Sequence, residues 1–453
     1  MAKVVMFWFR RDLRLEDNRG LSRALKLAEE LNASVAPVFI FDKGILSELE
    51  DKDDARVGFI YKTIAAMKET LRAQGSDLFV WHDRPLDLWK SIAAKGLPLP
   101  DGSCAEILKV IANHDYEPRA IRRDDEARKE LSAAGIDFET FKDQVIFDRN
   151  EVVKDDGKPY TVFTPFSKRW RMVFEDRRSS GIDELAPEAC GIRFRHFLKV
   201  SDVPLPTLGE VGFTENRQIE LPGVRVAASV LVDYGKNRNT PSLPGTTRLG
   251  LHLRFGTVSI RKLVRLAMEL NADVWLSELI WREFFMQILF HFPHVDGLPF
   301  RREYEKIVWR NNESEFQAWC EGRTGYPIVD AGMRELNQTG FMHNRVRMIA
   351  GSFLTKHLLV DWRWGEAYFA RKLLDFELSA NNGNWQWVAG SGCDAAPYFR
   401  VFNPTLQAEK FDPDQRYIAR WVPEFSAMDY PAPIVDHAIA RARVLKAYEV
   451  LKK

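Results

Sequence analysis

Short apolar runs alternate with segments of helical spacing along the first third of the chain. The apolar runs are residues 4–9, 34–41 and 78–81, with a fourth at 105–112 that fits either a strand or a helix. Residues 21–31 and 57–74 carry apolar side chains three and four positions apart, which predicts helices between the runs. Because parallel strands are joined by crossover helices, this alternation predicts an α/β domain with a doubly wound parallel sheet covered on both faces.

Helical spacing dominates the second half of the chain. The predicted helices are residues 260–270, 275–292, 331–339, 345–358, 365–374 and 434–451. Residues 144–222 are rich in proline, glycine and charge, which is typical of a connector. We therefore expect an α/β domain over 1–143, an interdomain connector over 144–222 and an all-helical domain over 223–453. No glycine-rich phosphate loop follows a predicted strand, so the sheet alone indicates no activity.

Composition narrows the class of protein. The chain has 453 residues, of which 45% are hydrophobic, enough for two or three domains with substantial cores. Its formal net charge of +1 means that any nucleic-acid surface must be a local basic patch. The sequence shows no signal peptide and no apolar run of transmembrane length, so we expect a cytoplasmic protein without membrane contact.

The cysteines lie far apart in the sequence. They are Cys104, Cys190, Cys320 and Cys393, and no pair has the spacing of a zinc site. We expect reduced thiols rather than a disulfide framework, and no metal. More unusual are the 13 tryptophans and 30 phenylalanines. Most aromatic residues belong to cores, but indoles also stack on flat ligands and carry electrons, so their positions decide which role applies.

The densest candidate chemistry lies in residues 375–404, which read DFELSANNGNWQWVAGSGCDAAPYFRVFNP. Buried charges and amides are costly without partners, so a polar ligand with a large flat ring would account for acids, amides and indoles packed this closely. A structural interpretation is the alternative, with Trp385 and Trp387 as core aromatics and Asn381 and Asn382 as a helix cap. The run continues to Tyr398, Phe399 and Arg400.

A second candidate is the helix predicted over residues 275–292. Glu278, Trp281 and Arg282 share one face of it, which places an acid, a flat ring and a cation together. The alternative is an amphipathic helix with a surface pair of arginine and glutamate.

Two further segments contain groups that suit anions. Arg345 and Arg347 stand at the start of a predicted helix, where the helix dipole disfavours cations, which suggests that they meet a carboxylate or a phosphate. Residues 245–250 (GTTRLG) offer hydroxyl and backbone N–H groups that can hold a phosphate. A solvated basic turn and an ordinary turn are the respective alternatives.

Taken together, the motifs of this chain resemble those of the DNA photolyase/cryptochrome family. In order they are WFRRDLRLEDN (8–18), WRE (281–283), TGYPIVDAGMREL (324–336), TGFMHNRVRM (339–348), NNGNWQW (381–387) and DAAPYFRVFNP (394–404). The resemblance implies an N-terminal α/β antenna domain and an all-helical C-terminal domain that holds FAD, reduced in the active form.

The resemblance also assigns residues to the cofactor. Arg347 and Asp375 are similar to an ion pair beside the flavin ring, and Asn381 matches the position that faces flavin N5. Asparagine cannot donate a carboxylic proton to N5, which favours an anionic, fully reduced flavin. The electron-transfer chain that the family uses to reduce its flavin matches Trp385, Trp362 and Trp309. The other cofactor residues implied are Tyr234, Thr246, Thr247, Arg248, Leu249, Gly250, Trp275 and Glu377.

Within the family, residues 342–345 and Met348 are most similar to class I cyclobutane pyrimidine dimer photolyases. (6-4) photolyases carry adjacent histidines in this stretch, whereas here His343 is followed by Asn344. The lesion and DNA contacts implied are Arg238, Glu278, Trp281, Arg282, Asn344, Arg345, Met348, Trp387 and Gln407.

The function that this resemblance implies is light-driven repair of cyclobutane pyrimidine dimers in DNA. An electron would pass from photoexcited reduced FAD to a lesion flipped out of the duplex, with Glu278 as a catalytic residue. A cryptochrome-type blue-light photoreceptor, or a (6-4) photolyase, without dimer repair is the alternative. UV-damaged DNA is the implied partner, and we expect a monomer.

The chain departs from the family pattern at a few positions. Gly250 and Leu251 stand where relatives have Ser-Pro, Glu377 stands where many have Asp, and Phe341 replaces a frequent Trp. Folate-binding relatives carry Asn-Glu shortly after a Tyr-Glu pair, but here Glu117 is followed by Pro-Arg-Ala. The antenna chromophore therefore stays open between a folate, a deazaflavin, a second flavin and none.

Overall fold

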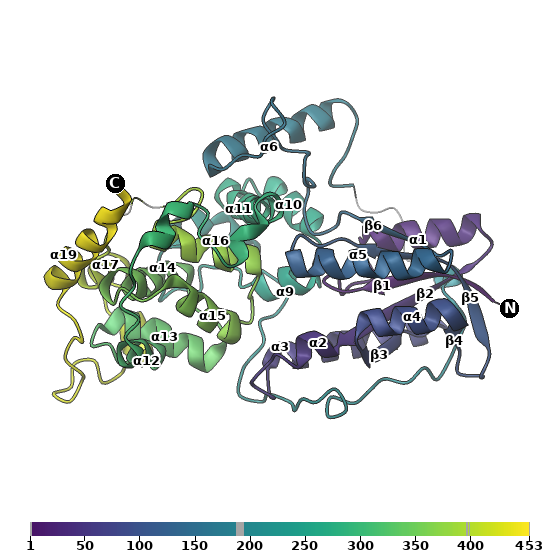
Figure 1. Cartoon of the computed structure of the whole chain (residues 1–453), viewed down its shortest axis with the longest axis horizontal. Coiled ribbons are helices and arrows are strands. Elements are labelled where there is room, and N and C mark those ends of the chain that lie inside the picture. The colour runs from purple at the N-terminus through teal and green to yellow at the C-terminus, as the bar shows by residue number, and fades with distance from the viewer. Residues whose placement is uncertain (1, 187–193, 396, 398, 453) are drawn as a thin grey trace. The chain divides into compact units, whose positions relative to one another are not determined.

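The computed structural model describes residues 2–186, 194–395, 397 and 399–452 (Figure 1), so Cys190 and Tyr398 lie outside the described residues. The chain forms two compact units. Unit 1 comprises Met1–Glu151, Met172–Arg217 and Leu251–Leu266, and unit 2 comprises Val152–Arg171, Gln218–Gly250 and Ala267–Lys453. Both units take residues from 144–222, and the boundaries at 143 and 222 stay a prediction.

Unit 1 is built on a mixed, mainly parallel sheet. Its strands are β1 (Lys3–Phe9), β2 (Ser34–Asp42), β3 (Phe79–Asp83), β4 (Leu97–Pro98), β5 (Cys104–Asn113) and β6 (Asp137–Phe141). The strand order is β3-β2-β1-β5-β4, and β6 pairs with β5. Every pair is parallel except β4 with β5. The parallel sheet is thus confirmed, and the ambiguous run at 105–112 is a strand.

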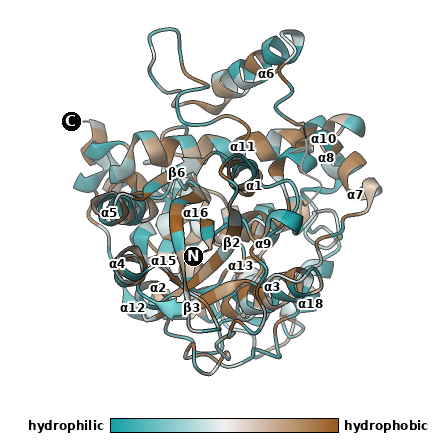
Figure 2. Cartoon of the chain, turned by 90° about the vertical axis from the view of Figure 1, so that its right-hand side faces the viewer, coloured by the Kyte–Doolittle hydropathy of each residue, from teal (hydrophilic) through white to brown (hydrophobic). Residues whose placement is uncertain are grey.

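Helices cover both faces of this sheet. Side chains alternate between the faces along a strand, so Val5 and Phe7 of β1 join one apolar core while Val4 and Met6 join the other. The first core includes α1 (Arg19–Glu30) and α3 (Ala55–Arg72), and the second includes α4 (Pro85–Lys95) and α5 (Pro118–Ala133). Figure 2 shows these two helix pairs on opposite sides of the strands. Burial on both faces explains why the strands are continuous apolar runs and confirms the doubly wound arrangement.

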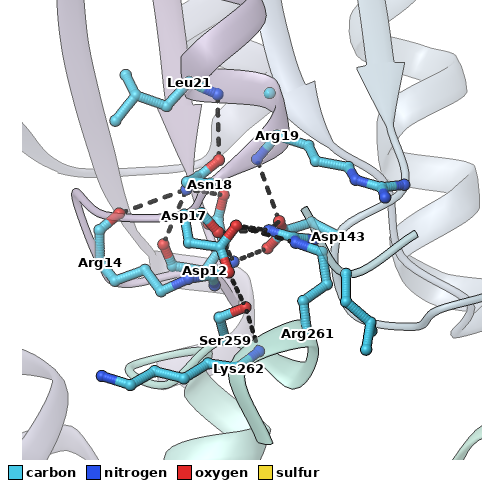
Figure 3. A network of polar contacts seen from close by, with 12 residues as sticks. Asp12, Arg14, Asp17, Asn18, Arg19, Leu21, Asp143, Ser259, Arg261 and Lys262 are labelled. Atoms are coloured by element: carbon cyan, nitrogen blue, oxygen red, sulfur yellow. Dashed lines mark hydrogen bonds and ion pairs between the residues drawn. The ribbon is translucent and has the colours of Figure 1, made fainter. Parts of the chain in front are cut away.

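A buried polar network follows β1 (Figure 3). The Asp12 carboxylate accepts hydrogen bonds from the side-chain amides of Asn113, at 2.6 Å, and Asn18, at 3.2 Å. Burial raises the pKa of Asp12, and the nearby Asp143 carboxylate adds to this effect. These contacts hold the turn that leads into α1, where the Asn18 side chain caps the helix by accepting from Leu21 N–H at 3.1 Å.

The centre of the same network is Arg261, at the start of α10 (Ile260–Glu269), which has no exposed side-chain surface. Its guanidinium lies 2.9 Å from Asp17 Oδ1 and 3.0 Å from Asp143 Oδ1. Arg14 approaches the other oxygen of Asp143 at 2.6 Å. The charged residues of the motif at 8–18 therefore have a structural role, which sequence reasoning left unassigned.

All regular elements of unit 2 that the structure describes are helical. Those lying wholly within it are α7 (Ala228–Val232), α8 (Tyr234–Asn237), α11 (Asp273–His291), α12 (Glu313–Cys320), α13 (Pro327–Thr339), α14 (Asn344–Ser352), α15 (Trp362–Lys372), α16 (Leu378–Ala389), α17 (Pro404–Phe411), α18 (Arg416–Trp421) and α19 (His437–Ala447), with the shorter turns η2 (Pro293–Asp296), η3 (Arg302–Lys306), η4 (Phe353–His357) and η5 (Tyr448–Lys452). The expected helical domain is confirmed.

Two predicted helices give way to other helical turns in the structure, and the helix expected over 331–339 begins earlier, at Pro327. The helix expected over 345–358 ends at Ser352, and a π-helical turn, η4, follows it. The helix expected over 434–451 begins at His437 and gives way to the 3-10 turn η5. Periodicity of apolar residues does not distinguish these tighter or wider turns from an α-helix.

The described residues offer little to suggest other chemistry. Cys104, Cys320 and Cys393 carry free thiols, and burial raises the pKa of Cys320 and Cys393 to about 12. None of the described helices combines the length and apolar character that a membrane crossing requires. Nor do these residues include a group of three metal-ligating side chains placed to hold an ion.

Candidate functional site

The first candidate site is a cavity in unit 2 between α14, α15 and α16. Its volume is about 90 Å³. Phe369, Trp385 and Trp387 give it flat walls. The residues assigned from sequence that line it are Asn344, Arg347, Met348, Asp375, Glu377, Asn381, Trp385 and Trp387.

An ion pair crosses one side of this cavity. Arg347 Nη2 lies 2.9 Å and 3.1 Å from the two carboxylate oxygens of Asp375, and Arg347 Nε donates to the Met342 carbonyl at 2.7 Å. This is the carboxylate that the cation at the start of α14 was expected to meet. Gly250 packs closely against the pair, because a Cβ placed there would lie 2.6 Å from Asp375 Cβ. A serine at this position would require Asp375 to move.

Asn381 and Asn382 lie within α16, not at its end. Asn381 donates through Nδ2 to the Glu366 carbonyl, at 3.1 Å, and to Glu366 Oε1, at 2.8 Å. Asn382 donates to the Val295 carbonyl at 2.8 Å. The interpretation of these amides as a helix cap is therefore wrong, and Glu377 holds the cap position. Glu366 was not predicted, because its contact with Asn381 joins separate helices and leaves no pattern in the sequence.

Trp385 is both a core residue and a wall of the cavity. Its side chain is 3% exposed, and its ring centroid lies 4.9 Å from Phe369 and 6.1 Å from Trp319. Gly365 of α15 allows this packing, since a Cβ there would clash with the Trp385 ring. Trp362 belongs to the same core, against which Trp309 and Trp387 pack half-buried. The structural interpretation of Trp385 and the functional one are therefore compatible.

The acid and the cation on the candidate face of α11 have partners elsewhere in unit 2. Glu278 forms an ion pair with Arg238, and Arg282 lies 3.9 Å from Glu377. The Arg238 guanidinium also lies 5.2 Å from the ring centroid of Tyr234. Burial, assisted by the Glu278 carboxylate, raises the pKa of Tyr234 to about 12.

The indole of Trp281 has one face covered. Its ring stacks on Phe163 with centroids 3.6 Å apart and planes inclined by 8°. Phe163 lies at the start of α6 (Phe163–Ser179), in the segment expected to be a connector, so no local pattern predicts this role. Trp275, on the same helix as Trp281, is buried at 3% exposure.

Residues 246–250 form a turn ahead of α9 (Gly250–Phe255). Thr247 Oγ1 accepts from Leu249 N–H at 3.4 Å, and Leu249 is buried while Thr246 is half-exposed. Arg248 is exposed and has a left-handed backbone with φ 53°. Its guanidinium lies 4.4 Å from the ring centroid of Phe341, so the residue that replaces a frequent tryptophan still faces a cation.

A basic groove shares Met348 with the first cavity. It is lined by Asn239, Arg345, Met348, Arg400, Phe402, Gln407, Lys410 and Phe411. Arg345 donates to Asn239 Oδ1 at 2.6 Å and lies 4.3 Å from the Phe411 ring centroid. Burial lowers the pKa of Arg345, with Arg238 and Arg400 contributing. Of this lining the sequence predicted Arg345, Met348 and Gln407; the other cations, Arg400 and Lys410, were missed.

Unit 1 has its own cavity, at the ends of β1 and β2. Its volume is about 240 Å³, and its lining combines Trp8 and Phe41 with the charged side chains of Arg11, Glu117 and Arg254. Arg11 pairs with Asp115 at 3.0 Å and Glu117 at 2.9 Å. The lining thus combines apolar walls with arginines that are paired with carboxylates.

Two family models match the chain. One, described as "DNA photolyase", covers residues 5–187, and the other, "FAD binding domain of DNA photolyase", covers residues 275–429. A curated relative from Halobacterium salinarum, named deoxyribodipyrimidine photo-lyase, is 36% identical over 98% of this chain and 98% of its own length.

Solved structures show the same likeness. A bacterial class III photolyase from Agrobacterium tumefaciens has a TM-score of 0.82 and 33% identity, over 100% of this chain and 98% of its own. An archaeal photolyase from Sulfolobus tokodaii, solved with two FAD molecules, has a TM-score of 0.78 and 34% identity, over 99% of this chain and 100% of its own.

Proposed function

Since the chain belongs to the DNA photolyase family, we propose that it uses light to repair cyclobutane pyrimidine dimers in UV-damaged DNA. The family and the FAD expected from the motifs are confirmed. The observation that carries the proposal is the pairing of two sites in unit 2. A cavity with aromatic walls, an ion pair and a buried amide shares Met348 with a groove rich in arginine and lysine.

The residues of the cavity fit the flavin ring of FAD. The ring has an apolar half and a hydrogen-bonding half. Trp385 and Phe369 offer flat apolar surface, while Arg347, Asp375 and Asn381 offer a cation, an anion and an amide. Reduced FAD, when bound and excited by blue light, supplies the electron that splits the cyclobutane ring and takes it back afterwards. We assign Tyr234 and residues 246–249 to the rest of the cofactor.

Glu278, Trp281 and Asn344 are assigned to the flipped lesion. The Glu278 carboxylate can accept from a pyrimidine N–H, and Arg238 balances its charge before the lesion arrives. The Trp281 ring, which stacks on Phe163 and lies 5.5 Å from the Phe285 ring centroid, supplies apolar surface for a pyrimidine. A dimer pairs and stacks poorly, so flipping it costs less than the few kcal/mol needed for an intact base.

A blue-light photoreceptor without repair activity is the second candidate. It would need FAD and the tryptophan chain but no DNA groove beside the cofactor. Arg345, Arg400, Lys410 and Gln407 line such a groove, and Asn344 faces the cavity where a (6-4) enzyme has a second histidine. These residues favour dimer repair over both alternatives.

The experiment that tests the proposal uses the photoreduced protein and two oligonucleotides, one with a single thymine cyclobutane dimer and one with a (6-4) photoproduct. We expect the absorbance of intact thymine to return under blue light with the first substrate, and to stay unchanged in the dark or with the second. Recovery only with the (6-4) substrate, or with neither while FAD is bound, would contradict the proposal.

Arg345→Ala should weaken DNA binding without changing lesion selectivity. One lost phosphate contact is expected to reduce the slope of log affinity against log salt by about 1. Affinity for damaged and undamaged duplex is measured over a salt series. Arg441→Ala is the control, since Arg441 is an exposed arginine of α19 outside the groove. An unchanged slope in Arg345→Ala would remove the groove from the DNA interface.

We assign the cavity of unit 1 to an antenna chromophore. Trp8 and Phe41 offer flat apolar surface for such a chromophore, while Arg11 and Arg254 are paired with Glu117. The same repair assay run as an action spectrum tests this. The assignment is supported if repair activity peaks at a wavelength where reduced FAD absorbs only weakly. That peak should disappear when the second chromophore is removed. An action spectrum that follows reduced FAD alone contradicts it.

A further inference from the structure

One face of the first half of α6 is aromatic. Phe163, Phe166 and Trp170 stand at positions i, i+3 and i+7, which places their side chains on the same side of the helix. This face contacts α11, since the Phe166 ring centroid lies 5.2 Å from that of Phe284 and Trp170 Nε1 donates to the buried Glu283 carboxylate at 2.7 Å. The start of α6 therefore packs along the helix that carries the acid and the indole assigned to the lesion.

The ring of Phe163 makes the closest of these aromatic contacts. It lies 3.6 Å from the Trp281 ring with the planes inclined by 8°, and the Phe285 ring lies 5.5 Å from Trp281. Phe285 in turn packs against α16, because a Cβ at Gly383 would clash with its ring. Trp281 stays half-buried among these neighbours, so part of the indole is open to a ligand.

The backbone of Phe163 makes a second contact. Its N–H donates to Asp394 Oδ2 at 2.9 Å. The first N–H groups of a helix have no partner within it, and the helix dipole favours a carboxylate there, so Asp394 caps α6 from a distant segment. Asp394 opens the motif at 394–404, which leads to Arg400 in the basic groove. One residue thus joins Trp281 to the segment that carries a groove cation.

We propose that Phe163 is a positioning residue that holds the Trp281 indole in the plane on which the lesion packs and, through Asp394, fixes that plane relative to the basic groove. The inference rests on the proposed function in assigning Trp281 to the flipped lesion. Flat contacts are sensitive to placement, since a gap of about 0.5–1 Å loses about a quarter to a half of the attraction between two atoms. A Trp281 ring that can tilt would bind the dimer less well and leave phosphate contacts unchanged. Phe163 therefore contributes to the discrimination between damaged and undamaged DNA.

The test measures, in the dark, the affinity for a duplex with one thymine dimer relative to the same duplex without damage. Phe163→Leu keeps the backbone N–H and an apolar side chain but loses the ring. We expect it to lower this affinity ratio about twofold to tenfold, the contribution of one stacked aromatic pair. Phe163→Tyr keeps the ring and should retain the wild-type ratio. Phe166→Leu is the matched control and should also retain it, because Phe166 packs on Phe284 of the same helix.

A double variant separates positioning from ordinary packing. Trp281→Leu should lower the affinity ratio at least as much as Phe163→Leu does. The two changes together should equal Trp281→Leu alone, because the ring to be positioned is gone. An unchanged ratio in either single variant, or full additivity in the double variant, would overturn the inference. An equal loss in Phe166→Leu would overturn it too, since general loosening of α6 would then explain the effect.

The contact with Asp394 has its own pair of variants. Asp394→Ala removes the acceptor for the Phe163 N–H, whereas Asp394→Asn keeps a side-chain oxygen that can accept. We expect the alanine variant to have a lower affinity ratio than the wild type and the asparagine variant to restore it. A wild-type ratio in Asp394→Ala would overturn the link between Trp281 and the groove.

FAD content, thermal unfolding and the rate of flavin photoreduction are measured for every variant. They should match the wild type in the Phe163 and Asp394 variants, because other residues form the described lining of the cofactor cavity. Phe163→Met fills the same space with a flexible side chain instead of a flat ring, and it replaces Phe163→Leu if that variant loses FAD. Light-driven repair by the wild type is measured separately, so failure of this inference and failure of the proposed function are distinguishable.

Discussion

Trp385→Phe is expected to abolish light-driven reduction of the bound flavin while leaving dimer repair by the chemically reduced protein nearly intact. Trp385 lines the cavity assigned to the flavin, and its indole is assigned to deliver the first electron. A phenyl ring is much harder to oxidise. We expect the rate of photoreduction to fall at least about a hundredfold, the loss that a barrier higher by about 3 kcal/mol produces.

The measurement is flavin absorbance during blue illumination with an external reductant. Trp362→Phe and Trp309→Phe should also slow photoreduction, because both are assigned to the same chain. Trp319→Phe is the matched control. Trp319 is fully buried, lies 6.1 Å from Trp385 and donates to the Ala350 carbonyl at 3.1 Å, yet it has no assigned part in electron transfer.

The Trp319→Phe control also distinguishes two routes by which an electron could reach Trp385. Trp319 touches the Trp385 ring edge-on, so it is a physical alternative as the next electron donor. If Trp319→Phe stops photoreduction and Trp362→Phe does not, the electron reaches Trp385 through Trp319 of α12, and the assigned chain is wrong. If Trp385→Phe slows photoreduction but neither Trp319→Phe nor Trp362→Phe does, the external reductant returns an electron directly to oxidised Trp385.

The fold was predictable where burial leaves a periodic pattern. β1 and β2 are buried on both faces, so nearly every residue is apolar and the strands are evident in the sequence. β6 (Asp137–Phe141) is short, carries only two apolar residues and lacks regular alternation, so it was missed. The π-helical turn η4 was missed for a related reason, since its residues are all buried and periodicity cannot reveal a change in hydrogen bonding.

The candidate site was predictable as a set of residues but not as a set of contacts. The motifs identified Asn381, Arg347 and Asp375, because the family pattern fixes those positions. The contact of Asn381 with Glu366 joins two helices, and the stacking of Phe163 on Trp281 joins segments more than a hundred residues apart. Such pairs depend on tertiary packing, which a single sequence does not encode in any local spacing.

Arg261→Met is expected to lower the free energy of unfolding far more than substitution of an exposed arginine does. Arg261 is fully buried, and its guanidinium lies between the carboxylates of Asp17 and Asp143. Methionine has a similar length and no charge, so the substitution leaves the buried Asp143 carboxylate and the partly buried Asp17 carboxylate, with Arg14 still paired with Asp143. Removing one partner from a buried ion pair costs about 3–5 kcal/mol, because the charge left behind has lost its compensation.

The free energy of unfolding is measured by denaturant titration, with Arg23→Met as the matched control. Arg23 pairs with Glu30 at 3.3 Å on the exposed face of α1, and such pairs contribute only about 0–1 kcal/mol. Arg261→Lys separates charge from geometry, since an ammonium group keeps the charge but cannot bridge two carboxylates through a planar fork. A loss in Arg261→Met no greater than that of the control would mean that water or Arg14 compensates both carboxylates. The motif at 8–18 would then require a role other than holding unit 1 together.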